Sequence, residues 1–167
     1  MKSADSDLGP VISREQFDRV AGYIDIGQRE GARIVTGGGA DVSEGRGYYL
    51  KPTVLADALG TMRVVREEIF GPVLCVQRFD EDDLPAIAAK ANDTEYGLAA
   101  SVWTRDLATA HQIVRQIKAS TVWVNTHSAT DPALPFGGYK QSGWGREMGR
   151  QAVESYSEVK SVAIQLF

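Results

Sequence analysis

The sequence predicts an α/β domain built on a mainly parallel sheet with flanking helices. Three observations support this fold class. Between residues 73 and 125, apolar strand-like runs alternate with helix-like runs, which is the order typical of parallel sheets. The run 73–79 is mostly apolar, as expected when both faces of a sheet are covered. Good helix-capping residues, Ser13 and Asp106, stand before two of the predicted helices.

The predicted elements follow one another along the chain. Ser13 with Gln16 three residues later indicates a helix start, and Gly31 ends that helix. Strands are predicted at 33–36, 48–55, 73–79, 99–104 and 121–125, and further helices at 82–92 and 106–118. The polar, glycine-containing residues 40–47 indicate a surface loop.

The remaining segments set the expected domain boundaries. Residues 127–149 are rich in Gly and Pro and predict a long shaped loop, which in compact domains is usually functional. We expect one domain over 8–156, a disordered polar leader over 1–7 and a terminal strand over 157–167. That strand has no local partner, so we expect it to pair at a distance or with another chain.

Composition excludes several classes of function. A chain of 167 residues with 43% apolar and 24% charged residues is typical of one soluble globular domain. A net charge of −4 with scattered basic residues favours neither nucleic acid nor anionic membrane as a partner. No apolar run approaches the roughly 20 residues that span a bilayer. One Cys and no cluster with zinc-ligand spacing predict no metal site and a reducing cytoplasm.

The first motif is Glu-Glu-Ile-Phe-Gly-Pro at residues 67–72. A carboxylate here could accept hydrogen bonds from a ribose diol, while the aromatic ring packs on a flat heterocycle. The alternative is structural: a solvated acidic pair, a buried aromatic side chain and a turn before the next strand. The motif alone leaves both interpretations open.

The second motif is Pro-Phe-Gly-Gly-Tyr-Lys-Gln-Ser-Gly at residues 135–143. Its glycines allow unusual backbone angles and close backbone approach. Gly143, Gly145 and Gly149 miss the dinucleotide fingerprint by one residue, and they do not lie in a first strand-to-helix turn. The segment therefore predicts a shaped loop that leads into a helix, and not a phosphate-binding loop.

In this order, the two motifs resemble the C-terminal part of the catalytic domain of the aldehyde dehydrogenase superfamily, over residues 8–162. The resemblance implies that Glu68 holds the nicotinamide ribose and that Phe70 packs beside the nicotinamide. It also places Gln16 and Arg19 near cofactor-contacting positions, although a helix surface is their alternative role.

The same resemblance implies a substrate tunnel in the second motif. Phe136 matches the aromatic residue that lines the aldehyde tunnel, and residues 127–134 match the tunnel mouth. His127 and Thr130 are therefore expected substrate contacts, with an exposed loop position as the alternative for His127. The sequence of residues 131–136 is most similar to that of bacterial enzymes acting on arylacetaldehydes, and the sequences of betaine-aldehyde-like enzymes are also close.

Three parts of that family's machinery have no counterpart in this sequence: the nucleophilic cysteine, the general-base glutamate and the cofactor-binding Rossmann domain. The single cysteine, Cys75, lies within an apolar run after the first motif, which predicts a protonated core thiol. A thioacyl mechanism needs an attacking thiolate and a base that activates water. We therefore expect a fragment of an NAD- or NADP-dependent enzyme that binds no cofactor and is inactive alone.

Two other functions are alternatives to the fragment. One is a non-catalytic assembly module that self-associates or joins a full-length partner, because the terminal residues 157–167 resemble the family's oligomerisation strand. This interpretation predicts a homo-oligomer formed through that strand. The other is a small complete enzyme that uses Cys75 as nucleophile, which nothing in the residue spacing supports.

Overall fold

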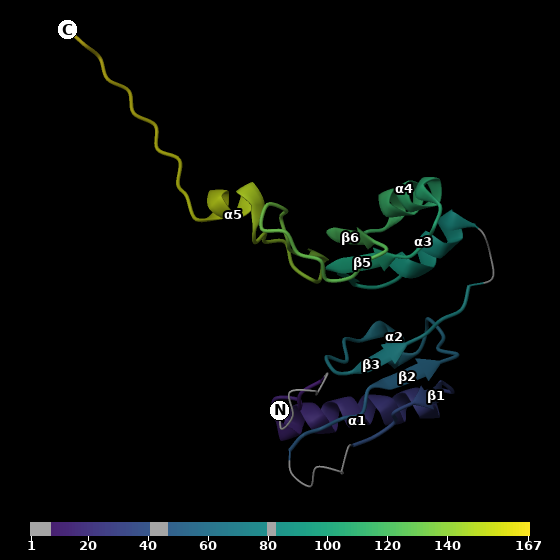
Figure 1. Cartoon of the computed structure of the whole chain (residues 1–167). Coiled ribbons are helices and arrows are strands. Elements are labelled where there is room, and N and C mark those ends of the chain that lie inside the picture. Colours follow the sequence, from purple (N-terminus) through teal and green to yellow (C-terminus); the bar gives the residue numbers. More distant parts are fainter. Residues whose placement is uncertain (1–7, 41–46, 80–82) are drawn as a thin grey trace. The chain divides into compact units, whose positions relative to one another are not determined.

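The computed structural model describes residues 8–40, 47–79 and 83–167 (Figure 1). The predicted leader 1–7 and most of the predicted loop 40–47 lie outside the described residues. The chain divides into two compact units, Met1–Asp80 and Glu81–Phe167. Each unit has its own helices and strands.

Helix α1 (Arg14–Arg29) opens the first unit and begins where the capping pattern predicts. The Ser13 hydroxyl accepts a hydrogen bond from the backbone N–H of Gln16 at 3.1 Å, which satisfies one of the free donors of the first turn. Gly31, with φ of +104°, follows the helix end. Its left-handed backbone is easiest for glycine, so the predicted helix end is confirmed.

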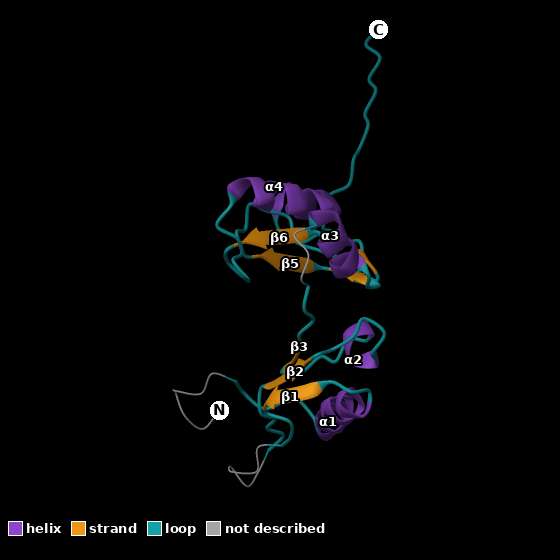
Figure 2. Cartoon of the chain, turned by 90° about the vertical axis from the view of Figure 1, so that its right-hand side faces the viewer, coloured by secondary structure: helices purple, strands orange, loops and turns teal. Residues whose placement is uncertain are grey.

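A three-stranded sheet packs against this helix. The strands are β1 (Arg33–Thr36), β2 (Thr53–Ala56) and β3 (Val73–Cys75), in the order β1-β2-β3. β1 and β2 are antiparallel, whereas β2 and β3 are parallel. Helices α1 and α2 (Arg63–Arg66) lie on one face of the sheet (Figure 2).

The core of the first unit lies between the sheet and these helices. Leu55 from the central strand and Val20 from α1 are completely buried. Hydrophobic side chains from both helices and from the loops surround them: Tyr23, Ala32, Leu50, Ala58, Met62, Val64 and Ile69. Burial of this apolar surface is the main force that fixes α1 on the sheet.

The second unit contains helices α3 (Leu84–Asn92), α4 (Leu107–Gln116) and α5 (Gly149–Ser155), and strands β4 (Tyr96–Gly97), β5 (Ala99–Val102), β6 (Thr121–Val124) and β7 (Tyr139–Lys140). β5 and β6 are parallel, and β4 pairs antiparallel with β7. The side chains of Asp83 and Asp106 accept hydrogen bonds at the starts of α3 and α4. The cap predicted at Asp106 is confirmed.

The predicted α/β class is confirmed, but the described sheets are small and mixed and do not form the mainly parallel sheet that was predicted. The described residues form three small sheets, of which one is mixed, one antiparallel and one parallel. The alternation of strands and helices over 73–125 predicted a mainly parallel sheet. Of the described strands in this stretch, β5 and β6 pair in parallel with each other, whereas β3 joins the sheet of β2 and β4 pairs antiparallel with β7. The short β7 returns within the glycine-rich loop to pair with β4, and β1 pairs antiparallel with β2, because chain direction in a sheet depends on distant partners.

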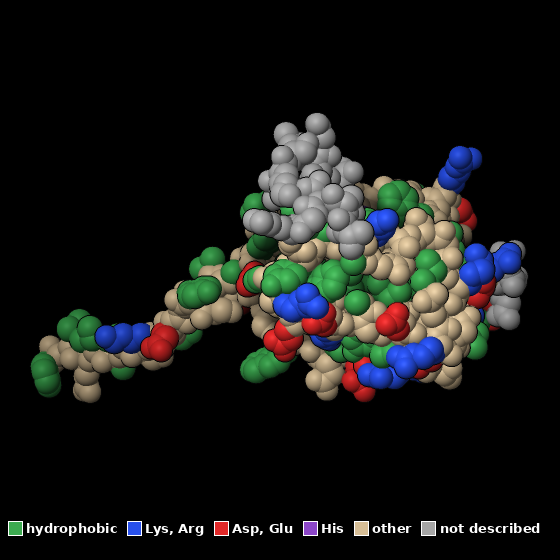
Figure 3. Space-filling model, turned by 90° about the horizontal axis from the view of Figure 1, so that it is seen from below, with side chains coloured by type: hydrophobic (Ala, Val, Ile, Leu, Met, Phe, Trp, Pro, Cys, Tyr) green, Lys and Arg blue, Asp and Glu red, His purple; other side chains and the backbone are tan. Residues whose placement is uncertain are grey.

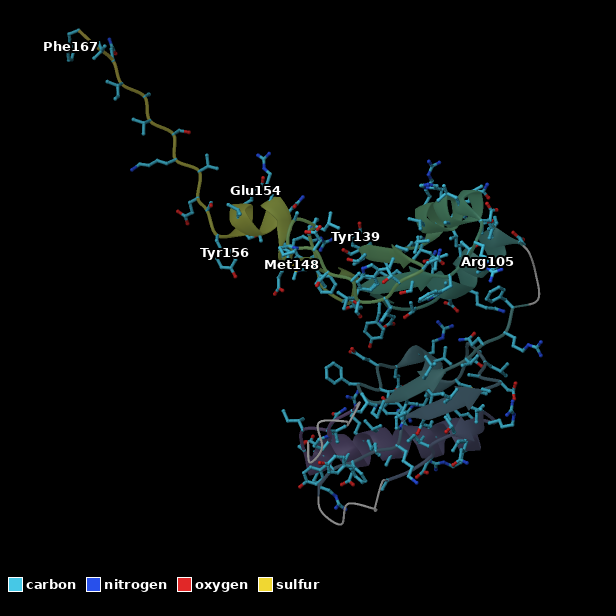
Figure 4. The ribbon with its side chains drawn as sticks, in the orientation of Figure 1. Arg105, Tyr139, Met148, Glu154, Tyr156 and Phe167 are labelled. Carbon is cyan, nitrogen blue, oxygen red and sulfur yellow. The ribbon has the colours of Figure 1, made fainter. Side chains whose placement is uncertain are left out.

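Residues 157–167 form no hydrogen-bonded strand in the described chain. Tyr156 stands at the end of α5 and Phe167 at the tip of the extended segment (Figure 4). Apolar side chains occur along the segment together with charged ones (Figure 3), and Val159 is fully exposed. The pairing of this segment therefore stays a prediction.

Within the part of the chain that the structure describes, no helix is long and apolar enough to cross a membrane.

Replacing Leu55 with alanine should destabilise the first unit by about 2–5 kcal/mol, because the change leaves a cavity in a closed core. The matched control is Leu59→Ala at a side chain that is 62% exposed, which should change stability by less than about 0.5 kcal/mol. Urea unfolding followed by circular dichroism measures both. Equal unfolding midpoints for the two variants would contradict a closed core around Leu55.

Candidate functional site

The two motifs lie in different units, and each builds its own surface. The first motif forms a turn between α2 and β3 in the first unit. The second motif forms the loop around β7 in the second unit.

The two adjacent glutamates of the first motif differ in their contacts. Glu67 is held by Arg63, whose Nε and Nη2 donate to its two carboxylate oxygens at 2.9 Å each. The Tyr23 hydroxyl donates a third hydrogen bond to Glu67 at 2.7 Å. Hydrogen bonds from Arg63 and then Tyr23 lower the pKa of Glu67 from 4.5 to about 2. Its neighbour Glu68 is exposed, and its carboxylate makes no hydrogen bond or ion pair with the described residues.

Helix α1 supports the backbone of this turn. The Gln16 side-chain amide donates to the carbonyl oxygen of Phe70 at 2.7 Å and to that of Ile69 at 3.4 Å. The Arg19 guanidinium donates to the carbonyl oxygen of Glu68. Gln16 and Arg19 lie three residues apart, so they share one face of the helix. Both residues were predicted near cofactor-contacting positions, and the structure gives them a role in supporting the turn.

Phe70 projects from this turn. Its φ of +56° is a left-handed backbone angle, which non-glycine residues adopt only where surrounding contacts enforce it. The ring is 73% exposed. At the next position, a Cβ on Gly71 would stand 2.5 Å from a Val20 methyl group, so only glycine allows α1 to approach this closely. The turn thus presents an exposed aromatic ring beside the Glu68 carboxylate, which has no partner among residues 8–40, 47–79 and 83–167.

A shallow hollow of about 390 Å³ lies beside this turn, and Glu68, Phe70 and Cys75 are among its lining residues. The Cys75 thiol is half-buried and donates a hydrogen bond to the carbonyl oxygen of Val64 at 3.2 Å. Burial raises the pKa of the Cys75 thiol. A protonated thiol is a poor nucleophile, so Cys75 lacks the chemical state that attack on a carbonyl requires.

In the second unit, Asn125 turns the chain at the end of β6. Its side-chain oxygen accepts from the backbone N–H of Thr104 at 2.9 Å, and its amide nitrogen donates to the carbonyl of Thr104 at 2.8 Å. The amide thus replaces a strand partner beyond the end of β5. Asn125 has a φ of +55°, a left-handed angle that asparagine tolerates better than most residues.

His127 packs on the sheet at this turn. Its Nδ1 lies 2.8 Å from the Ser101 hydroxyl oxygen, and its ring stands edge-on to Trp123 with centroids 5.3 Å apart. The Trp123 indole N–H donates to the carbonyl of Ala129 at 2.7 Å. These contacts fix the start of the loop 127–149.

A second hollow, of about 300 Å³, lies beside β6 in the same unit. It is lined mainly by apolar and aromatic side chains, including Trp123, Thr130, Leu134, Pro135, Phe136 and Met148. Two of the predicted tunnel residues, Thr130 and Phe136, thus share one hollow. His127 is not among its lining residues.

The other residues of the second motif hold the loop in shape. Phe136 exchanges two backbone hydrogen bonds with Glu147, at 2.8 and 2.7 Å. A Cβ on Gly137 would collide with the carbonyl oxygen of Gly145, and one on Gly138 would collide with that of Ser142. The glycines are therefore required by close backbone contacts. Among the nine residues of the motif, Pro135 and Phe136 alone line the hollow.

Lysine and serine tie the same loop to α3 and β4. Lys140 Nζ donates to the carbonyl oxygens of Asn92 and Thr94 at 2.9 Å each, where α3 ends and its last carbonyls need partners. The Ser142 hydroxyl accepts from the backbone N–H of Gly97 at 3.1 Å. No role was predicted for Lys140, or for Tyr23 and Arg63 in the first unit. Only the four-residue spacing of Arg63 and Glu67 could have indicated one of these contacts.

No group of three or more His, Cys, Asp or Glu side chains suited to a metal ion occurs among residues 8–40, 47–79 and 83–167. What these surfaces offer is a carboxylate and an aromatic ring in one unit, and an apolar hollow in the other. An ionised carboxylate accepts hydrogen bonds from hydroxyl groups, and an aromatic ring packs on flat apolar surfaces.

Comparison with known proteins gives one consistent result. The family described as "Aldehyde dehydrogenase family" matches residues 1–162. The betaine aldehyde dehydrogenase of Brucella anthropi is 45% identical over 163 residues, which are 96% of this chain and 33% of that protein. The chain therefore spans about a third of the length of the curated relatives that it matches.

Solved structures agree with this match. The NAD⁺ complex of an aldehyde dehydrogenase from Bacillus cereus superposes with a TM-score of 0.91 and 44% identity, over 99% of this chain and 33% of that one. An indole-3-acetaldehyde dehydrogenase of P. syringae, in complex with NAD⁺ and IAA, gives a TM-score of 0.90 and 43% identity, over 96% and 32% of the two chains.

The paired glutamate predicts a particular dependence of stability on pH. The pKa of Glu67 is lower in the folded chain, about 2, than its ordinary value of 4.5. Its ionised form therefore stabilises the fold above pH 4.5, and this contribution is lost as the pH falls from 4.5 towards 2. Glu67→Gln should lower stability at pH 7 and weaken the pH dependence of stability within that window.

Glu68→Gln is the matched control, because it removes the adjacent carboxylate, which has no partner among the described residues. It should leave stability at pH 7 within about 0.5 kcal/mol of the parent chain. Urea unfolding between pH 2 and pH 7 compares the three proteins. An equal loss of stability in the two variants would show that the Arg63 and Tyr23 contacts do not distinguish the glutamates.

Proposed function

Because this chain belongs to the aldehyde dehydrogenase family, we propose that it provides the C-terminal part of the catalytic domain of an enzyme that oxidises an aldehyde to a carboxylic acid with NAD or NADP. The observation that carries the proposal is the turn at 67–71. It leaves the Glu68 carboxylate without a partner among the described residues, beside a Phe70 ring that is 73% exposed. The similarity to relatives solved with NAD⁺ supports it further.

On the cofactor side, Glu68 would accept hydrogen bonds from the hydroxyl groups of the nicotinamide ribose. Phe70 would pack beside the nicotinamide ring. Gln16 and Arg19 act on this site through the backbone of the turn, by holding the carbonyl groups of residues 68–70. When bound, the cofactor accepts the hydride that the aldehyde loses.

On the substrate side, the hollow lined by Phe136 and Thr130 would receive the side chain of the aldehyde. Its lining is mainly apolar and includes two aromatic rings, Trp123 and Phe136. Such a surface suits a flat aromatic group, so we propose arylacetaldehydes as the substrate class. His127, packed on Trp123, would support the entrance to this hollow from outside its lining.

Aldehyde oxidation at these surfaces depends on a reactive thiolate that this sequence does not supply. Its one cysteine, Cys75, keeps its proton and donates a hydrogen bond to the carbonyl oxygen of Val64. Aldehyde oxidation through a thioacyl intermediate needs a thiolate that attacks the carbonyl carbon. We therefore propose that this chain alone does not turn over aldehydes. A single free thiol also suits a reducing compartment, and we propose the cytoplasm.

The direct test is NADH or NADPH formation from phenylacetaldehyde by the purified chain, with NAD or NADP supplied. We expect no formation above that of a mock purification from the same host. The Cys75→Ser variant is assayed in parallel. Turnover that survives removal of host dehydrogenases and disappears in Cys75→Ser would contradict the proposal and make Cys75 the nucleophile.

A second candidate function is assembly, and residues 157–167 favour it. Apolar side chains recur along this exposed segment, at Val159, Val162, Ile164, Leu166 and Phe167. An extended apolar segment with unpaired backbone groups is a template for pairing with the sheet edge of another chain. We propose that this segment joins copies of the chain into a homo-oligomer.

Sedimentation velocity over a hundredfold range of concentration tests the assembly. We expect the average mass to rise with concentration for the whole chain, and to stay at the monomer value after deletion of residues 157–167. A whole chain that is monomeric at every concentration, or a deleted chain that associates equally well, would overturn this candidate.

A further inference from the structure

Trp123 connects the apolar hollow of the second unit to a pair of side chains that lie outside it. The Trp123 ring is partly buried and lines the hollow together with Phe136. Its indole N–H donates to the carbonyl oxygen of Ala129 at 2.7 Å, so one edge of the ring is held by the loop that follows β6. The pair consists of Ser101 and His127, and neither is among the lining residues.

The parallel pairing of β5 and β6 places Ser101 beside Trp123. The two residues are register partners in adjacent strands (Figure 1). Side chains of register partners project from the same face of a sheet, so the Ser101 hydroxyl stands on the face that carries the Trp123 ring. After β6 the chain turns through two left-handed residues, Asn125 with a φ of +55° and Ser128 with a φ of +56°. His127, between them, returns over that face.

His127 bridges Ser101 and Trp123. Its Nδ1 lies 2.8 Å from the Ser101 hydroxyl oxygen, and its ring meets the Trp123 ring edge-on, at an angle of 69°. A hydroxyl group both donates and accepts hydrogen bonds, so this bond forms whichever ring nitrogen of His127 carries the proton. Edge-to-face contact is a favoured arrangement of aromatic rings. The Ser101 hydroxyl therefore fixes the imidazole, and the imidazole fixes one side of the indole ring.

An indole ring that is already fixed favours flat ligands in the hollow. Ordering a mobile side chain when a ligand binds costs conformational entropy. A flat aromatic ring gains most where it stacks on another ring or meets it at a defined angle, whereas an aliphatic group packs against a wall in several positions. Release of the Trp123 ring should therefore weaken the binding of aromatic ligands more than that of aliphatic ones.

We infer that His127, held by Ser101, is a positioning residue that keeps the Trp123 ring in the wall of the hollow and thereby sets the preference of the hollow for flat aromatic side chains. His127 acts through Trp123 and does not touch the substrate. The inference rests on the proposed function, in which the hollow receives the side chain of an arylacetaldehyde, and it adds the residues that set this selection.

The test measures probe binding by the whole chain, so it does not require turnover. The probes are phenylacetate and cyclohexylacetate, which carry the same charge and the same number of carbon atoms, but only phenylacetate has a flat ring. Titration followed by the indole N–H signal of Trp123 in NMR spectra gives the dissociation constant of each probe, and Trp123→Phe identifies that signal. The exchange rate of the same N–H measures how often its hydrogen bond to Ala129 opens.

Ser101→Ala and His127→Ala should each reduce the preference for phenylacetate over cyclohexylacetate by about two- to tenfold, because each removes the hydrogen bond that fixes the imidazole. Both changes should also speed up exchange of the Trp123 indole N–H. Ser101→Thr keeps a hydroxyl group at this position and should retain the parent preference. His111→Ala is the matched control, because His111 is the other histidine of the chain and is exposed on α4.

The ratio of the two dissociation constants separates positioning from a merely structural role, which would weaken both probes equally. A lower preference and faster exchange in Ser101→Ala and His127→Ala, with the parent values in Ser101→Thr and His111→Ala, support the inference. An unchanged preference in the two alanine variants overturns it. If one of these variants melts below the parent temperature, the other decides. If both do, the pair holds the unit together and the inference is overturned.

The parent chain alone tests the proposed function on which the inference rests. We expect it to bind phenylacetate more tightly than cyclohexylacetate. A parent chain that binds both probes equally well, or binds neither, contradicts arylacetaldehydes as the substrate class, and the inference falls with it. A parent preference that the alanine variants retain contradicts the role of His127 alone and leaves the substrate class standing.

Discussion

The hydrogen bonds from helix α1 to the turn at 67–71 are the constraint on which the cofactor side of this chain depends. A short turn with a left-handed phenylalanine would not keep one conformation in water. Gln16 and Arg19 hold its carbonyl groups, and Gly71 lets Val20 pack directly against its backbone. The helix is itself fixed by the core beneath it. The position of Glu68 therefore follows from packing between a helix and a sheet, and the loop need not be rigid by itself.

The elements that were predictable depend on neighbours in sequence. Ser13 and Asp106 cap helices through side chains that reach two or three residues along the chain, so a local pattern is sufficient. Strand direction is different, because β7 and β4 meet across more than forty residues. No periodic pattern of apolar residues in the sequence indicates that pairing. The predicted parallel pairing accordingly holds for β5 and β6, but the described strands do not form one mainly parallel sheet.

The site shows the same division. The motifs located both surfaces, and the resemblance selected Phe136, which lines the apolar hollow. The four-residue spacing of Arg63 and Glu67 could have indicated their contact. No local pattern could indicate the hydrogen bond from Tyr23, which lies 44 residues before Glu67. Nor could the sequence show that His127 packs on Trp123. Most residues of the second motif hold the loop in shape and do not line the hollow. The motif therefore predicted the fold of the loop better than it predicted which residues line the hollow.

The bond between Lys140 and the end of α3 has a consequence for proteolysis. Trypsin must draw a lysine side chain into its own pocket, yet the Lys140 ammonium already binds the carbonyl oxygens of Asn92 and Thr94. Cleavage after Lys140 therefore requires the last turn of α3 and the loop to separate. The rate of cleavage after Lys140 therefore measures how often this part of the second unit opens.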